Sequence, residues 1–379
     1  MITNVIVLHG GRCYLWEKIS NMKAAVMYSK GEMPRYADLP EPVVQNEDEV
    51  LVSVKAVALK HFDKGRAKGT HYSAGGERRE AGGKKRDAGE DEREAGVERQ
   101  DAGGKKRDDG GDEQDANVIG GDGVCLLPDG TRVYAIGISG MMAEKATVEK
   151  DRMVPIPAGL DDVTAAALPN AVFGAAMALR FRAGIEPGDT VLINGATGFT
   201  GRVAVQIARH YGAGKVIATG RNPQSLQELT ELGADEVIPL QQTDEQFSAQ
   251  LRGLRQHTPL HVIIDYLWGH TAEIILASLK GTGSFTPRTR FVSVGSVTGD
   301  LIQLSAANLR SVDLQLLGSG LGSWTKSQVR TLFGEILPEM FQLAADGKLK
   351  VGTISVPLRD IGTLWDMDVP DGKRLVVQI

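Results

Sequence analysis

The second half of the chain alternates short apolar runs with longer segments in which apolar residues recur at helical spacing. Such runs, rich in Val and Ile, are typical of strands buried on both faces of a parallel sheet. They predict strands over Val191–Asn194, Lys215–Thr219, Glu236–Pro239, Val262–Asp265, Arg290–Val294 and Leu314–Leu317. The intervening segments predict helices near Phe199–Tyr211, Ser225–Leu232, Asp244–Leu254, Thr271–Leu279 and Ser327–Ala345. Strands that alternate with helices in this way specify an α/β fold with a doubly wound parallel sheet.

The first half of the chain has a β pattern instead. Alternating and apolar runs occur at Ala24–Tyr28 and Val50–Val57, and Gly-Asp-Gly and Pro-Asp-Gly turns separate short predicted strands after Asn117. A small-residue helix follows over Ala165–Arg180, and we expect it to break near Pro169 because proline lacks the backbone N–H. The last β-like segments, which could return to this first domain, are Val351–Val356 and Leu375–Ile379.

Residues 74–115 interrupt this pattern with six heptads that are rich in glycine and charge. The heptads lack the pair of large apolar residues that a coiled-coil seam needs, and glycine disfavours a helix. With 24 charged residues and no aromatic one, the segment cannot bury enough surface to offset its ordering entropy. Its formal charge of −4 disfavours binding to nucleic acid. We therefore expect a disordered insertion in a surface loop.

The stretch Thr190–Gly201, TVLINGATGFTG, carries the strongest chemical signal. Gly195, Gly198 and Gly201 recur at a spacing of three between a predicted strand and a predicted helix. Glycines at such a junction allow a tight turn and let backbone N–H groups and a helix N-terminus approach a phosphate. The stretch therefore predicts a dinucleotide site.

The end of the next predicted strand indicates which dinucleotide binds. Gly220, Arg221 and Asn222 stand where a dinucleotide fold reads the ribose. An acidic residue there would bond the 2′-hydroxyl of NAD and repel a 2′-phosphate, but this chain has none. The Arg221 guanidinium suits a phosphate, so the expected cofactor is NADPH.

Length and composition limit the number of domains, the classes of partner and the cell compartment that we expect. A chain of 379 residues is long enough for two domains, and its net charge of −5 implies no general attraction to nucleic acid or membranes. The two cysteines, Cys13 and Cys125, form neither a disulfide framework nor a zinc lobe, which fits a reducing cytoplasm. No run of 18 apolar residues predicts a membrane span. Residues 1–21 lack the features of a secretory signal, and we expect an extension without a role in the fold before a domain that starts at Met22.

Several stretches, in order and spacing, resemble the medium-chain dehydrogenases/reductases in their zinc-independent, quinone-oxidoreductase-like branch. They include MKAAVMY, EDEVLVSVKAVALKHFDK, GDGV, GTRVYA, AAALPNAVFGAAMAL, GDTVLINGATGFTG, ELGADEVI, IIDYLWG, FVSVGSVTGD, LLGSGLGS and GKRLVVQI. The resemblance implies a GroES-like, mainly β catalytic domain over residues 22–152, a Rossmann domain over 153–323, and a return to the catalytic domain over 324–379. It places the active site in the cleft between the two domains.

The resemblance also implies site residues. Cofactor contacts are implied for Asn170, Gly195, Ala196, Thr197, Gly198, Phe199, Thr200, Gly201, Gly220, Arg221, Asn222, Tyr266, Gly295, Ser296, Gly318 and Ser319. Lys60 aligns with the family position that faces the nicotinamide, and Tyr72 is a second catalytic candidate, whereas Asp63 is expected to hold local structure. Because the catalytic Cys, the Gly-His-Glu motif and the four-cysteine lobe of zinc-dependent relatives are missing, we expect no metal site.

Together these features predict an NADPH-dependent reductase of quinones or α,β-unsaturated carbonyl compounds that transfers hydride without zinc. We expect a cytoplasmic homodimer whose partner is a small-molecule substrate, with no nucleic acid or membrane involved. The alternative is an NADPH-binding regulatory or sensor protein with the same fold and little or no activity. Steady consumption of NADPH with a quinone or enone would favour the enzyme, and saturable NADPH binding without turnover would favour the sensor.

Overall fold

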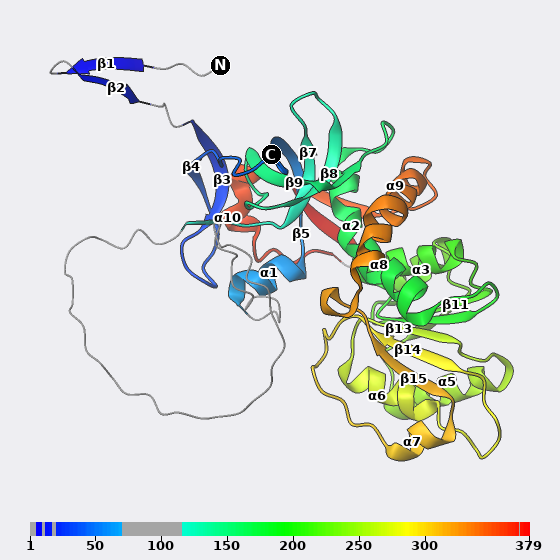
Figure 1. Ribbon diagram of the computed structural model, residues 1–379. Helices are drawn as coiled ribbons and strands as arrows, with labels where there is room; N and C mark the ends of the chain where they lie inside the picture. Colours follow the sequence, from blue (N-terminus) through cyan, green and yellow to red (C-terminus); the bar gives the residue numbers. More distant parts are fainter. Residues whose placement is uncertain (1–4, 10–11, 17–19, 70–115, 371) are drawn as a thin grey trace, which may run out of the picture.

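The protein consists of a mainly β lobe, which holds strands from both ends of the chain, beside an α/β lobe (Figure 1). The computed structural model describes residues 5–9, 12–16, 20–69, 116–370 and 372–379. The expected fold class, a parallel sheet with a second, mainly β domain, is confirmed. The heptads over 74–115 and the catalytic candidate Tyr72 lie outside the described residues, so what we expect of them stays a prediction.

A six-stranded sheet in which every neighbouring pair is parallel forms the core of the α/β lobe. The strands lie in the order β12-β11-β10-β13-β14-β15. Their bounds are Thr190–Asn194 for β10, Lys215–Gly220 for β11, Glu236–Pro239 for β12, Val262–Asp265 for β13, Thr289–Ser293 for β14 and Leu314–Gly318 for β15. The strand order therefore reverses between β10 and β13, and sheets of this topology bind ligands outside the carboxyl ends of the strands at that point.

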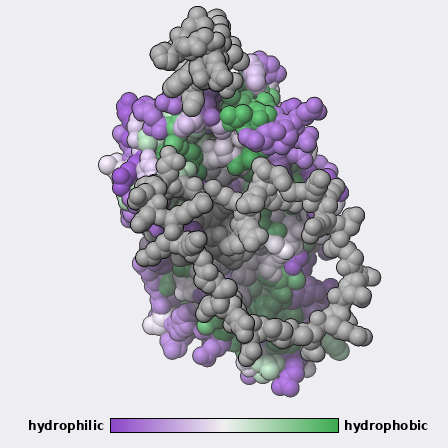
Figure 2. Space-filling view, turned by 60° about the vertical axis from the view of Figure 1, so that its left-hand side comes forward, coloured by the Kyte–Doolittle hydropathy of each residue, from purple (hydrophilic) through white to green (hydrophobic). Residues whose placement is uncertain are grey.

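Helices cover both faces of this sheet, because successive side chains of each strand point in opposite directions. Val191 and Ile193 of β10 pack into a cluster with α2, α3 and α4, whereas Leu192 packs into a second cluster with α5 and α6. The predicted helices are confirmed: α3 Phe199–His210, α4 Pro223–Glu231, α5 Asp244–His257, α6 Gly269–Ser278, α8 Lys326–Thr331 and α9 Leu337–Ala345. Shorter helical segments are α7 Ala306–Ser311, η3 Leu321–Ser323 and η4 Leu332–Ile336. Outside these cores, hydrophilic side chains surround separate hydrophobic patches on the face shown in Figure 2.

Helix α2 (Asp162–Met177) corrects one expectation. It does not break near Pro169 but continues across it and ends in a π-helical segment, η2 (Ala178–Ala183). A proline inside a helix costs about 3 kcal/mol. The alanines and other apolar residues of α2 are buried along most of its length, and this packing outweighs the cost. The span Asp162–Ala183 is long and apolar enough to cross a membrane, yet 67% of that window is buried inside the protein, as in a core helix.

The β lobe is organised around β5, which has strands on both of its edges. β17 and β7 pair with it antiparallel, and β9 pairs with its first half, so β5, β7, β8 and β9 close into a small barrel. The strands of this sheet are β5 Glu49–Leu59, β7 Asp122–Leu126, β8 Arg132–Gly137, β9 Lys145–Pro155, β16 Gly352–Pro357 and β17 Lys373–Gln378. A three-stranded sheet beside it comprises β3 Asn21–Met27, β4 Arg35–Pro40 and β6 Asn117–Val118. The helices of this lobe are α1 His61–Lys68, η5 Leu358–Asp360 and α10 Ile361–Leu364.

Two strands precede this lobe. β1 (Val5–His9) and β2 (Arg12–Trp16) form an antiparallel hairpin, and within the described residues they pair only with each other. β3 begins at Asn21, one residue before the domain start expected at Met22. The expectation that residues 1–21 play no role in the fold stays a prediction.

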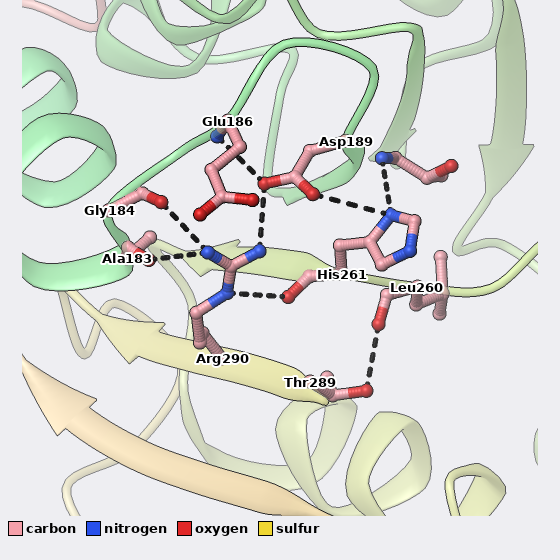
Figure 3. Close-up of polar contacts among 9 residues, drawn as sticks. Ala183, Gly184, Glu186, Asp189, Leu260, His261, Thr289 and Arg290 are labelled. Atoms are coloured by element: carbon pink, nitrogen blue, oxygen red, sulfur yellow. Dashed lines mark hydrogen bonds and ion pairs between the residues drawn. The ribbon is translucent and has the colours of Figure 1, made fainter. Parts of the chain in front are cut away.

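A polar cluster joins the amino ends of β10 and β14 to the end of η2 (Figure 3). Arg290 donates from Nη1 to the carbonyl oxygens of Ala183 at 2.9 Å and Gly184 at 2.8 Å. Its Nη2 lies 2.7 Å from Oδ2 of Asp189, and its Nε donates to the carbonyl oxygen of His261 at 3.3 Å. Every nitrogen of this guanidinium therefore has a partner within the protein.

Candidate functional site

The glycine turn follows β10 at the opposite, carboxyl edge of the sheet. Gly195 has a φ of 85°, a conformation that favours glycine and lets the chain leave the strand sharply. Thr219, near the end of β11, fixes the turn. Its Oγ1 accepts the N–H of Gly195 at 3.2 Å, and its carbonyl oxygen accepts the N–H of Ala196 at 2.8 Å. The turn is therefore shaped by the neighbouring strand and does not need a ligand to form.

The other two glycines of the turn have different surroundings. A Cβ on Gly201 would lie 2.5 Å from the carbonyl oxygen of Gly195, so α3 can pack this closely only with glycine there. Among the described residues, a Cβ on Gly198 would meet nothing nearer than 3.8 Å, so these residues leave the space before it open. Gly198 is the N-cap of α3, and no described side chain caps the helix. The first N–H groups of α3 are thus presented to a ligand, as in phosphate sites.

A buried polar network supports the turn from below. Asn194, at the end of β10, donates from Nδ2 to Oδ1 of Asp265 at 2.7 Å, and its Oδ1 accepts the hydroxyl of Thr219 at 2.7 Å. Asp265 also accepts the N–H groups of Leu267 and Trp268, and burial raises the pKa of its carboxyl. The sequence pattern alone does not predict this network. A polar residue that ends each of two neighbouring apolar strands is the signal that could have revealed it.

The cofactor residues expected from the other strands lie at the same edge. They are Tyr266 after β13, Gly295 and Ser296 after β14, and Gly318 and Ser319 at the end of β15. Helix α2 also reaches this edge, because a Cβ on Gly174 would lie 3.2 Å from Thr200 and 3.8 Å from Tyr266. Asn170, which is half-buried, lies one helical turn before Gly174 and so on the same side of α2. Predicted residues from five separate segments therefore meet at one edge of the sheet.

The three residues expected to read the ribose have distinct surroundings. A Cβ on Gly220 would overlap the side chain of Thr197, so β11 lies directly against the glycine turn. Asn222 caps α4, since its Oδ1 accepts the N–H groups of Gln224 at 3.0 Å and Ser225 at 3.1 Å. Arg221 is exposed, and no side chain in the described part of the protein holds its guanidinium. Of the three, Arg221 is the one whose side chain is available to a ligand.

On the β lobe, the catalytic candidate Lys60 lies between two carboxylates. Its side chain is 2% exposed, and its Nζ contacts Asp122 and lies 3.4 Å from Oδ2 of Asp63. Tyr134 donates its hydroxyl to the other oxygen of Asp122 at 2.7 Å. Burial lowers the pKa of Lys60, but the attraction of Asp122 and Asp63 outweighs burial, so the pKa is raised. Lys60 is therefore a cation in a buried ion-paired cluster.

The sequence pattern does not predict Asp122 or Tyr134 as members of this cluster, whereas Asp63 is expected to hold local structure. That carboxylate accepts the N–H of Lys60 at 3.0 Å. Asp122 stands in a Gly-Asp-Gly pattern that predicts only a turn, and the pairing of β7 with β5 brings it to Lys60. Tyr134 reaches Asp122 because β8 pairs with β7. A lysine at the end of a buried strand requires an acidic partner. Which residue of the sequence supplies that partner depends on how the strands pair.

Comparisons with known proteins agree with this arrangement. The family model described as zinc-binding dehydrogenase matches residues 200–337. The probable NADPH-dependent quinone reductase tdiC of Emericella nidulans is 26% identical over 386 residues, which cover 91% of this chain and 96% of that protein. The quinone oxidoreductase-like protein 2 homolog of Nematostella vectensis is 28% identical over 236 residues, 62% of each chain. The quinone oxidoreductase of Thermus thermophilus, whose structure was also determined with NADPH, is 24% identical. It has a TM-score of 0.67, with 94% of this chain and 100% of that chain covered.

Proposed function

The chain is a quinone-oxidoreductase-like member of the medium-chain dehydrogenases/reductases, and on this premise we propose that it is a zinc-independent, NADPH-dependent reductase of quinones or α,β-unsaturated carbonyl compounds. One observation carries the proposal. An open glycine turn and an uncapped helix N-terminus lie at the carboxyl edge of the sheet, where the strand order reverses. This arrangement suits the pyrophosphate of a dinucleotide.

The residues at this edge fit NADPH. The N–H groups that follow Gly198 would hold the pyrophosphate, and the exposed guanidinium of Arg221 would hold the 2′-phosphate. The segments after β13, β14 and β15 would line the remainder of the cofactor, with Asn170 and Tyr266 on the side of α2. When bound, NADPH supplies the hydride.

Reduction of a conjugated carbonyl also requires that the negative charge developing on the carbonyl oxygen be stabilised. We propose that Lys60 contributes to this electrostatically, because its raised pKa keeps it cationic. Its contacts with Asp122 and Asp63 make it a poor proton donor, so the proton would come from water. Tyr72, the second catalytic candidate, remains a prediction.

The proposed reaction uses no metal. Within the described residues, no group of three or more His, Cys, Asp and Glu side chains could hold a metal ion. The chain also has only two cysteines, too few for the four-cysteine zinc lobe of zinc-dependent relatives. Metal analysis of the purified protein is expected to find well under one equivalent of zinc. Loss of activity on chelation that zinc restores would contradict this part of the proposal.

We further propose that the protein works as a cytoplasmic homodimer. β15 is the outer strand of the parallel sheet, and within the described residues its free edge pairs with nothing. Leu316 on this strand is 37% exposed and Leu321, just beyond it, is 53% exposed. An open edge with apolar side chains favours pairing with a second copy. Light scattering is expected to give twice the mass of one chain, and Leu316→Asp is expected to give the monomer.

Turnover tests the function itself. Purified protein is mixed with NADPH and a panel of quinones and enones, and loss of NADPH absorbance is followed against controls without substrate. Steady oxidation with at least one acceptor is the expected result, with a smaller rate from NADH. Saturable NADPH binding with no turnover on the whole panel would favour the sensor, and absence of NADPH binding would overturn both functions.

A further inference from the structure

Arg374 lies on β17, the last of the described strands, at the boundary between the two lobes. β17 pairs with β16 on one edge and with β5 on the other, so the strand is held inside the sheet. The residue as a whole is 8% exposed, although an arginine is rarely buried without a carboxylate partner. The fold therefore fixes the position of Arg374, and the question is which group pairs with its buried guanidinium.

The guanidinium of Arg374 lacks the partners that a buried arginine requires. Its Nε is buried without a hydrogen-bond acceptor, and within the described residues no carboxylate forms an ion pair with it. Asp63 and Asp122 lie near enough to attract it, but both carboxylates already hold Lys60. Burial lowers the pKa of Arg374 to about 10, and the attraction of Asp63 and Asp122 offsets only part of this cost. A buried donor without a partner costs free energy unless something else binds it.

What lies beside Arg374 is the start of α3. The guanidinium carbon is 4.5 Å from the ring centroid of Phe199, the first residue of that helix. Two residues before Arg374, a Cβ on Gly372 would overlap the guanidinium of Arg202 in the same helical turn. Arg202 itself is engaged, because its Nε donates to the carbonyl oxygen of Thr197 at 3.1 Å and its Nη2 lies 2.7 Å from Glu228. The beginning of β17 thus runs against the uncapped end of α3.

We propose that Arg374 binds the pyrophosphate of NADPH from the β lobe, opposite the N–H groups at the start of α3. The inference rests on the proposed function. A planar guanidinium can donate two parallel hydrogen bonds to phosphate oxygens, and Phe199 supports one face of it. Arg221, at the end of β11, is left for the 2′-phosphate. Because Arg374 belongs to one lobe and α3 to the other, one bound pyrophosphate would tie the two lobes together.

The test is the affinity of Arg374→Met for NADPH and for NADH, measured by calorimetric titration of the full-length protein. Both cofactors carry the pyrophosphate, so both dissociation constants are expected to rise by the same factor, at least about tenfold, or 1.4 kcal/mol. Arg374→Lys keeps the charge but loses the paired donors, and it should show an intermediate loss. Arg359→Met is the matched control, because it removes the same charge from the same lobe at a side chain that is 74% exposed.

Three results would overturn the inference. They are unchanged affinities in Arg374→Met, a loss confined to NADPH, or a loss of equal size in Arg359→Met. The melting temperature without cofactor checks that the variant folds, and it should not fall, because an unpaired buried charge has been removed. Were Arg374→Met to unfold, Arg374→Lys would provide the same comparison. Failure of the wild-type protein to bind NADPH would instead overturn the proposed function.

Discussion

An arginine that is largely shielded from water lies at each end of the strands of the parallel sheet, and the two arginines differ in their partners. At the amino edge, Arg290 has partners for every nitrogen of its guanidinium, including the carboxylate of Asp189 (Figure 3). At the carboxyl edge, Arg374 comes from the other lobe to the start of α3, and within the described residues its Nε has no hydrogen-bond partner. Arg290 thus belongs to a network in which every guanidinium nitrogen is bonded, whereas the described residues leave a nitrogen of Arg374 without a partner.

Whether the protein itself supplies the partners of a charged side chain distinguishes residues that stabilise the fold from residues that can bind a ligand. A buried charge that the protein satisfies itself contributes to folding, and removing it leaves its partners unpaired. A buried charge that the protein does not satisfy lowers stability until a ligand of opposite charge arrives. Stability in the absence of cofactor should therefore distinguish the two edges.

The largest expected effect is on Arg290. Arg290→Met removes the ion-pair partner of buried Asp189 and the side-chain donor to two carbonyl oxygens, and we expect the free energy of unfolding in urea to fall by about 3–5 kcal/mol. Arg288→Met is the control, since that exposed side chain pairs, within the described residues, only with Asp313 and should change stability by less than about 1 kcal/mol. An equal loss in Arg374→Met would remove the distinction between the edges.

The next largest effect concerns Lys60. Like Arg290, it finds its charged partners within the protein, here Asp63 and Asp122. Lys60→Met leaves buried Asp63 and partly buried Asp122 without their ion-pair partner, so we expect a loss of about 3 kcal/mol in stability. Adding Asp122→Asn removes one of those charges and should recover much of it. If Lys60 stabilises the developing charge, turnover falls at least about tenfold in both variants, which is about 1.4 kcal/mol. Normal turnover in the double variant would limit Lys60 to a structural role.

A smaller effect is expected at Arg221, which differs from Arg374 in being exposed. Arg221→Ala should raise the dissociation constant of NADPH about tenfold and leave that of NADH unchanged, because only NADPH has the 2′-phosphate. Its stability without cofactor should not change. A wild-type protein that binds NADH and NADPH equally well would contradict the assignment.

The smallest effect on stability is expected from deleting the heptads, which are not part of the parallel sheet. Lengthening a flexible loop from about 7 to 42 residues costs only roughly 1.6 kcal/mol of closure entropy. Deleting residues 75–115 is therefore expected to leave folding intact and to raise stability slightly, and a mild protease should cut this segment first. A deletion that abolished folding would show that the heptads are structural.

Sequence pattern was sufficient for the α/β lobe and for the glycine turn. Its strands are short continuous apolar runs, and the turn glycines are local, so both signals lie within a few neighbouring residues. Pattern failed at Pro169, where tertiary packing of α2 outweighs a local rule. It also could not pair Lys60 with Asp122 or place Arg374 on Phe199, because these contacts depend on how distant strands and the two lobes meet.

The pairing of β17 with β5 also bears on how the protein is made. Residues 56–59 align with residues 375–378, so β5 leaves the ribosome long before its partner strand exists. The strands and helices from β10 to β15 are contiguous in the chain, and that sheet can form while β5 still lacks its neighbour. Arg374 is on the last of the described strands to be synthesised. If it binds the cofactor as proposed, tight binding begins only after the ribosome has added β17, long after the parallel sheet can form.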